Sequence, residues 1–183
     1  MLDPRHHPPR PYFDRTARQL VLPNLQRLLG ACRGAGVEVV YTVIENLTRD
    51  GRDRSLDYKL SGFFVPKGSW EAQVAAEIAP LEDEIVLPKT SSSLFNSTNF
   101  DYLMRNIGID TIIATGFLTD QCVDHTVRDG ADRGYYMICV HDACATESPE
   151  RHRAALEAFR GYCRLMSTEE LVAELQDRAR GDG

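Results

Sequence analysis

The chain has 183 residues, enough for one domain with a sizeable core, and 43% of them are apolar while 26% are charged. The formal net charge of −6 argues against nucleic acid and against an anionic membrane as the main partner. No apolar run reaches the ~18 residues of a membrane span, and the first residues lack the apolar core of a signal peptide. We therefore expect a cytoplasmic protein.

The first half of the chain moves from a Pro- and His-rich start to a helix and a strand. We expect residues 1–15 to form a flexible segment and residues 16–180 to form a single domain. Leucines spaced three and four residues apart predict a helix over 22–36, which glycines end. The apolar run 37–45 predicts a mostly buried strand. The charged, irregular stretch 46–69 is long for a compact domain, and such loops are usually functional or form oligomer contacts.

The remaining pattern alternates short apolar strands with helical segments. Strands are expected over 84–88, 110–116, 135–142 and 162–167, and helices over 70–80, 99–108, 120–133, 148–161 and 168–179. This alternation predicts βαβ units, and therefore a three-layer α/β/α fold with a mostly parallel sheet. A doubly wound sheet normally begins with a strand, whereas this chain begins with a helix, so we expect the first strand to be missing from the sequence.

Reactive side chains follow several of the predicted strands. Glu45, Lys89 and Cys122 come after the first, second and third strands, and His141 and Asp142, at the end of the fourth, are weaker candidates. In open parallel sheets, ligands bind beyond the carboxyl ends of the strands. The shared position of these residues therefore predicts a site at that edge of the sheet.

Cys122 falls near the third position of a helix if Thr119 caps that helix. Unpaired backbone N–H groups and the helix dipole favour a thiolate there, and thiols so placed can have a pKa lowered from ~8.5 to between ~3.5 and ~7.5. The same N–H groups could hold an oxyanion when a carbonyl is attacked. The alternative interpretation is a buried structural thiol beneath the helix start.

The other candidate residues also have two interpretations. The five cysteines have no spacing typical of a disulfide framework or a zinc cluster, so they are interpreted as reduced thiols, most of which are core residues. Lys89 is either a solvated surface charge or part of a pocket lined by the small, polar segment that follows it. His125 is either an acid–base partner of Cys122 or, as we favour, an ordinary packed or solvent-facing helix residue.

Two stretches carry a resemblance to a known family. "TIIATGFLTDQCVDHTVRDGADRGYYMICVHDACAT" (111–146) resembles the signature of the isochorismatase-like cysteine hydrolases, and "LPKTSSSLFNSTNFDYLMRNIGIDTIIATG" (87–116) resembles their lysine loop, helix and strand. The resemblance runs from about residue 20 to 175. It implies a six-stranded, Rossmann-like α/β fold that often forms homodimers or homotetramers. It also implies an Asp–Lys–Cys triad that cleaves C–N bonds of small amides, ureido compounds or nicotinamide.

The resemblance assigns roles to individual residues. It makes Cys122 the nucleophile that forms a thioester and Lys89 the cation that supports the thiolate. It makes the backbone N–H groups of Leu118 and Cys122 the oxyanion hole. The peptide bond between Phe117 and Leu118 is expected to be cis, which costs several kcal/mol between non-prolines.

Two features depart from the family pattern. The triad aspartate normally ends the first strand, and Asp3 lies too close to Met1 for that role. We expect the natural chain to extend upstream of Met1, the alternative being a version without this aspartate. Relatives that act on nicotinamide hold a metal with an aspartate and histidines after the second strand, whereas residues 42–54 contain no histidine. We therefore expect no metal, no cofactor and a substrate other than nicotinamide.

The favoured function is a cysteine-dependent hydrolase that cleaves a C–N bond of a small amide or ureido substrate. Candidate substrate-binding residues are Glu45, Tyr58, Phe63, Phe64 and Trp70, although aromatic residues in such loops are more often core or subunit contacts. The alternative is a catalytically impaired interaction protein that keeps the fold without the aspartate. A nucleotide-binding module is disfavoured, because neither a strand-linked GxGxxG nor a GxxxxGK[ST] loop occurs.

Overall fold

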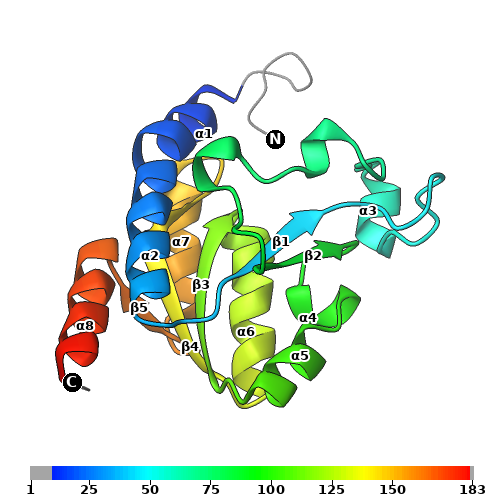
Figure 1. The fold of residues 1–183 in the computed structure, drawn as a ribbon. Coiled ribbons are helices and arrows are strands. Elements are labelled where there is room, and N and C mark those ends of the chain that lie inside the picture. Colours follow the sequence, from blue (N-terminus) through cyan, green and yellow to red (C-terminus); the bar gives the residue numbers. More distant parts are fainter. Residues whose placement is uncertain (1–9, 182–183) are drawn as a thin grey trace. The chain divides into compact units, whose positions relative to one another are not determined.

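The computed structural model describes residues 10–181, and its chain divides into two compact units. Unit 1 comprises Met1–Val39 and Asp110–Gly183, and unit 2 comprises Val40–Ile109. Over the described residues, each unit holds its own parallel sheet with helices beside it (Figure 1). The predicted α/β class and all five predicted strands are confirmed. Hydrogen bonds join these strands in two sheets. Alternation along the chain predicts parallel strands, but it does not predict which strands pair.

A continuous helical stretch opens unit 1. It consists of α1 (Pro11–Thr16), the π-helical turn η1 (Ala17–Val21) and α2 (Leu22–Gly34). Pro11 stands at the first helical position, where its fixed backbone angle and missing N–H group are tolerated. The ring of Phe13 meets that of Phe117 edge-on, with centroids 5.1 Å apart.

The expected flexible segment over residues 1–15 is corrected in the part that the structure describes. Residues 1–9 lie outside the described residues, and the rest of the segment enters α1. Phe13, Ala17 and Val21 are each fully buried, and their four-residue spacing places them on one helical face. Burial of this apolar stripe is the physical reason why the helix begins before residue 22.

Three parallel strands form the sheet of unit 1 in the order β3–β4–β5. Their bounds are β3 (Thr111–Phe117), β4 (Tyr136–Ala145) and β5 (Arg164–Met166). The register shifts once: Ala114 pairs with Cys139, but Gly116 pairs with Cys144. Because of this irregularity, β4 continues past its predicted end at residue 142, and its last residues lie beside the carboxyl end of β3.

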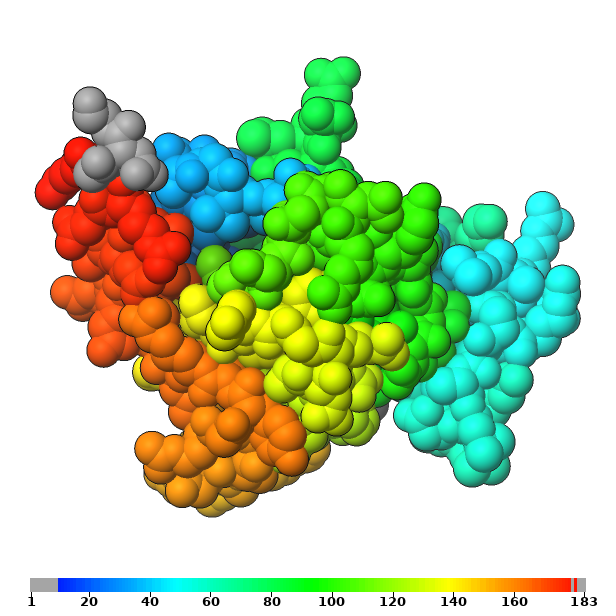
Figure 2. All heavy atoms as spheres, turned by 90° about the horizontal axis from the view of Figure 1, so that it is seen from below, coloured from blue at the N-terminus to red at the C-terminus, as the bar shows by residue number. Residues whose placement is uncertain are grey.

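Two pairs of helices pack beside this sheet. They are α2 with α8 (Thr168–Gly181), and α6 (Asp124–Asp132) with α7 (Pro149–Phe159). Both α2 and α8 contact β4, and Figure 2 shows the red atoms of α8 bordering the blue atoms of α2. On the other pair, Val127 and Phe159 are fully buried, and each such side chain contributes roughly 1.5–3 kcal/mol by leaving water.

Asp142 connects two of these helices to the end of β4. Its carboxylate accepts hydrogen bonds from the backbone N–H and the hydroxyl of Thr168, both at 2.8 Å. Its backbone carbonyl accepts a hydrogen bond from Asn24 Nδ2 at 2.9 Å. Since these contacts fix the start of α8 and a side chain of α2, they give Asp142 a structural role.

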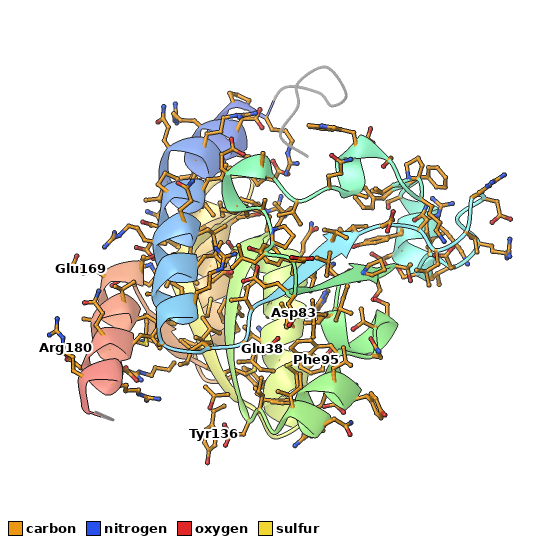
Figure 3. All side chains as sticks on the ribbon, in the orientation of Figure 1. Glu38, Asp83, Phe95, Tyr136, Glu169 and Arg180 are labelled. Carbon is orange, nitrogen blue, oxygen red and sulfur yellow. The ribbon has the colours of Figure 1, made fainter. Side chains whose placement is uncertain are left out.

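Unit 2 is built on two parallel strands and short helical segments. β1 (Val40–Ile44) pairs along its whole length with β2 (Ile85–Lys89). The helical segments are α3 (Leu56–Leu60), η2 (Trp70–Ala72), η3 (Ala76–Ile78), α4 (Leu94–Ser97) and α5 (Phe100–Ile107). Phe95, labelled on α4 in Figure 3, meets Phe100 edge-on with ring centroids 5.4 Å apart. Both rings are buried, so this pair anchors the first residues of α5.

The helix expected over 70–80 is wrong, because only two 3₁₀ turns form there. Ala72 is buried, whereas Trp70 is 48% exposed. A short helix needs an apolar face packed against a core, and this segment buries too little apolar surface to hold one. Conversely, the expected irregular stretch 46–69 contains the helix α3, and the expected loop after β2 contains α4.

The helices also bear on two expectations about partners. Among the helices that the structure describes, none is both long and apolar enough to cross a bilayer. Leu56 and Leu60 lie one turn apart on α3 and are both strongly exposed. The expected homodimer or homotetramer stays a prediction, and this apolar pair is a place to test it.

Candidate active site

Cys122 lies just beyond the carboxyl end of β3. It belongs to the π-helical turn η4 (Thr119–Val123), which continues directly into α6. The peptide bond between Phe117 and Leu118 is cis, the geometry predicted for it. Cys122 is partly exposed.

The cap of this turn differs from the prediction. Leu118, not Thr119, is the N-cap, and its carbonyl accepts hydrogen bonds from the backbone N–H groups of Gln121 at 3.1 Å and Val123 at 3.2 Å. Cys122 is therefore the fourth helical residue instead of the third. It still lies in the first turn, where backbone N–H groups and the helix dipole favour an anion.

The side chain of Thr119 points elsewhere. Thr119 is fully buried, and its Oγ1 lies 2.9 Å from Nδ1 of His152, a residue of α7. A threonine hydroxyl can cap a helix only if it faces the free N–H groups of the first turn. Here the hydroxyl is bound to a helix that follows much later in the chain, which is the physical reason for the misassigned cap.

Asp120 makes the strongest polar contacts of the turn. Its carboxylate accepts a hydrogen bond from Arg151 Nε at 2.6 Å, forms an ion pair with the same guanidinium, and accepts a hydrogen bond from the Thr146 hydroxyl. The partners lie 26 and 31 residues further along the chain, so local patterns did not reveal them. The sequence carries no signal for them, because the pattern does not predict that β4, which precedes Thr146, lies beside β3.

The other four thiols are poor nucleophiles. Burial raises the pKa of the Cys32 thiol, and a hydrogen bond with Cys144, together with burial, raises that of Cys139. Burial raises the pKa of Cys163 to about 12. Cys144 is itself buried on β4. Because the thiolate is the reactive form, none of the four suits attack on a substrate. Cys32, Cys139 and Cys144 are buried core thiols, whereas Cys163 is only partly buried.

Lys89 is the last residue of β2, in unit 2. Its side chain is buried, with the whole residue 4% exposed, and its Nζ donates hydrogen bonds to the backbone carbonyls of Ser91 at 2.9 Å and Ser92 at 3.1 Å. A buried ammonium group must have its N–H groups paired to offset the lost hydration. The interpretation of Lys89 as a solvated surface charge is therefore wrong, and the polar loop after β2 wraps around its charge.

Glu45 and Tyr58, two of the predicted substrate-binding residues, already have partners in unit 2. The Glu45 carboxylate accepts a hydrogen bond from the backbone N–H of Gly68 at 2.6 Å. Tyr58 is buried on α3, and its ring meets that of Phe63 edge-on at 4.9 Å. These contacts give both residues a part in holding the loop together, while their role in binding a substrate stays a prediction.

Of the other three candidates, Phe63 is the ring partner of Tyr58, and Phe64 and Trp70 are exposed. The Arg54 guanidinium lies over the Phe64 ring, 5.0 Å from its centroid, which is a favourable cation–π distance. Both rings are therefore accessible from solvent within unit 2. Their predicted contact with a substrate is not tested by these contacts.

Asn46 is a candidate that sequence reasoning missed. It follows Glu45 beyond the carboxyl end of β1 and is 1% exposed, yet its Nδ2 has no hydrogen-bond partner among the described residues. A buried donor without a partner costs about 1–3 kcal/mol. Its amide lies against Gly51, where a Cβ would come within 2.9 Å of Nδ2. A polar residue in a charged stretch gives no sign of burial, so only the structure identifies this donor.

Metal binding and a second acid–base group were also considered from the sequence. Over residues 10–181 there is no group of three or more His, Cys, Asp or Glu side chains that could hold a metal ion. The expectation of a site without metal stays a prediction. His125 is exposed on α6, which fits the favoured interpretation of an ordinary helix residue.

Comparisons with known proteins match most of the chain. Residues 9–170 match the isochorismatase domain family. The chain is similar to the ureidoacrylate amidohydrolase RutB of Enterobacter sp. (strain 638), at 32% identity over 82% of this chain and 74% of that protein. It is similar to N-carbamoylsarcosine amidase of Arthrobacter sp, at 33% identity over 75% of this chain and 54% of that protein. A solved cysteine hydrolase from Pseudomonas syringae pv. phaseolicola 1448A has a TM-score of 0.80, with 26% identity over 87% of this chain and 81% of that chain.

Proposed function

Because the chain belongs to the isochorismatase family of hydrolases, we propose that it cleaves a C–N bond of a small ureido or amide compound through a thioester on Cys122. The names of two relatives state hydrolysis of ureidoacrylate and of N-carbamoylsarcosine. Both compounds carry a carbamoyl group on nitrogen. An N-carbamoyl compound is therefore the substrate class that we propose for this chain.

The proposed reaction has two steps. In the first, the Cys122 thiolate attacks the carbamoyl carbon, and the backbone N–H groups of Leu118 and Cys122 hold the oxyanion that forms. The C–N bond then breaks, and the nitrogen takes a proton and leaves as an amine. In the second step, water attacks the carbamoyl thioester, which releases carbamate and restores the thiol. With a simple amide, the same steps release ammonia and then a carboxylic acid.

The position of one thiol carries this proposal. Cys122 is partly exposed in the first turn of η4, whereas Cys139 and Cys144 are buried, and burial raises the pKa of Cys32 and Cys163. Only a thiolate is a strong nucleophile and only an accessible one meets a substrate. Of the five thiols, Cys122 is therefore the one suited to attack a carbonyl carbon.

Alkylation tests this assignment without a substrate. Treatment of the folded protein with iodoacetamide at pH 7 is expected to modify Cys122 about tenfold faster than any other thiol, because the others are buried or protonated. Peptide mass spectrometry over a time course gives the five rates. In Cys122→Ser, the other four thiols should stay slow, which excludes general loosening of the fold. Uniform labelling, or protection of Cys122 alone, would contradict the assignment.

The unpaired amide of Asn46 offers a second test, on the stability of the protein. Because a buried donor without a partner costs free energy, Asn46→Leu is expected to keep the free energy of unfolding within about 1 kcal/mol of the original or raise it. Urea unfolding measures the effect. Asn106→Leu, at an exposed position of α5 where the amide donates to the Tyr102 carbonyl at 2.7 Å, is the matched control. A loss of more than about 2 kcal/mol in Asn46→Leu would contradict the absence of a partner for this amide among the described residues.

A further inference from the structure

Two consecutive residues of η4, the turn that contains Cys122, contact two consecutive residues of α7. Thr119 Oγ1 lies 2.9 Å from His152 Nδ1, and the Asp120 carboxylate accepts a hydrogen bond from Arg151 Nε at 2.6 Å. Two adjacent side-chain contacts restrain the position of the turn more than a single one would. The first turn around Cys122 is thereby attached to α7.

The helix that makes these contacts is itself firmly placed. Ser148 caps α7 with an Oγ that accepts a hydrogen bond from the backbone N–H of Arg151 at 3.3 Å, and Pro149 occupies the first helical position. Thr146, which is fully buried two residues before this cap, donates its hydroxyl to Asp120. The carboxylate of Asp120 is therefore held from two sides, by the end of β4 and by α7.

The charge of Asp120 gives this attachment an electrostatic consequence. Asp120 lies two residues before Cys122 on the same short turn, and a carboxylate charge on that turn disfavours a thiolate there, even though side chains two residues apart on a helix point in different directions. The Arg151 guanidinium pairs with that carboxylate and offsets its charge. Arg151 is the third residue of α7, where the helix dipole disfavours a cation, so its placement there is explained by Asp120 and not by α7 alone.

His152 is suited to its contact with Thr119. Burial, and to a smaller extent electrostatic interaction with His141, lowers the pKa of the His152 imidazole, although Asp120 acts in the opposite direction. The ring is therefore neutral at neutral pH, and one of its nitrogens can accept a hydrogen bond from a hydroxyl. A protonated ring could only donate.

We infer that Arg151 and His152 are positioning residues for Cys122: His152 holds the turn through Thr119, and Arg151 holds it through Asp120 while offsetting the carboxylate charge on the turn that carries the thiol. This inference rests on the proposed function for its meaning in catalysis, since Cys122 is the proposed nucleophile. The contacts themselves lie wholly within unit 1.

A double-mutant cycle on the charged pair tests the inference. The variants are Arg151→Gln, Asp120→Asn and the combination of the two, and the measurement is the rate at which iodoacetamide alkylates Cys122 at pH 7. Arg151→Gln is expected to slow alkylation about three- to tenfold, a moderate effect because the Arg151 side chain is 45% exposed and solvent screens the pair. The double variant is expected to react faster than Arg151→Gln, because the uncompensated carboxylate is gone.

The control lies on the same helix. Arg153 pairs at 3.6 Å with Glu150, and both side chains are well exposed, so Arg153→Gln is expected to stay within about twofold of the wild-type rate. Equal rates for Arg151→Gln and Arg153→Gln would overturn the inference. A double variant slower than Arg151→Gln would do the same, because it would show a purely structural contact.

Two further measurements allow a conclusion if Arg151→Gln does not fold or if the proposed function is wrong. If Arg151→Gln fails to fold, Thr119→Val decides the matter, since it removes the hydroxyl at nearly constant shape; alkylation about threefold slower supports positioning, and an unchanged rate overturns it. Alkylation needs no turnover, so the cycle is independent of the substrate. Full hydrolysis by Cys122→Ser alongside the expected alkylation cycle would refute the proposed function and leave the positioning of the thiol standing.

Discussion

Cys122→Ser is expected to lower kcat for ureidoacrylate or N-carbamoylsarcosine on the order of 10⁴-fold or more. A serine hydroxyl stays protonated at neutral pH, so the turn would present a weak nucleophile in place of a thiolate, and removal of a nucleophile typically has an effect of this size. A coupled assay that monitors release of the amine product from each compound gives kcat and KM separately. KM should change little, because the substitution alters the reacting atom and leaves the rest of the turn in place.

The matched control is Cys163→Ser. Cys163 is half-buried just before β5, and its Sγ contacts the backbone carbonyl of Phe159, so its loss should leave kcat within about twofold. Mass spectrometry of the wild-type protein during turnover should detect one added carbamoyl group on the peptide that contains Cys122. Retention of more than a tenth of the activity by Cys122→Ser would reject the thioester route. Failure of the wild type to hydrolyse either compound or related amides would favour the alternative of an interaction protein.

Local sequence patterns predicted the parts of the fold that depend on nearby residues. The strands before Lys89 and Cys122 are short apolar runs bounded by proline or glycine, and both form within a residue or two of the predicted bounds. The position of a thiol after a strand likewise follows from the chain alone. Because ligands bind beyond the carboxyl ends of parallel strands, such positions can be found without coordinates.

The errors arose where tertiary contacts decide the outcome. The early start of the first helix depends on burial of Phe13, Ala17 and Val21, which lie one turn apart. The Pro-rich composition of the first residues gave no indication of this burial. The cap at Leu118 instead of Thr119 depends on His152, which attracts the threonine hydroxyl away from the helix. The helix expected over 70–80 had suitable residues but too little apolar surface to bury. Propensity is a weak guide wherever packing opposes it.

The contacts that the sequence did not reveal are those between distant residues. The ion pair of Asp120 and Arg151 joins residues that are 31 positions apart in the sequence. The Asn46 amide lies against Gly51 in the loop after β1, a contact that depends on the conformation of that loop. Charged and amide residues occur most often on surfaces, so a sequence pattern favours the solvated interpretation for all of them. Lys89 shows the same limit, since only its hydrogen bonds to the following loop distinguish a buried ammonium from a surface one.

Lys89→Met is expected to lower kcat by about 10²–10⁴-fold, the usual contribution of a group that assists proton transfer or stabilises charge. The family resemblance implies that the Lys89 ammonium supports the thiolate, and methionine keeps the length of the side chain without its charge. Lys89→Arg, which keeps the charge, should recover part of the loss.

Lys89→Met also removes the hydrogen-bond donor of the Ser91 and Ser92 carbonyls. We expect this loss to lower the free energy of unfolding by up to about 3 kcal/mol, which urea unfolding measures. Lys59→Met, at the exposed end of α3, is the control and should leave kcat within about twofold. If Lys89→Met matched that control in kcat while losing stability, Lys89 would be a structural residue that holds its loop, and the proposed cation would have to be sought elsewhere.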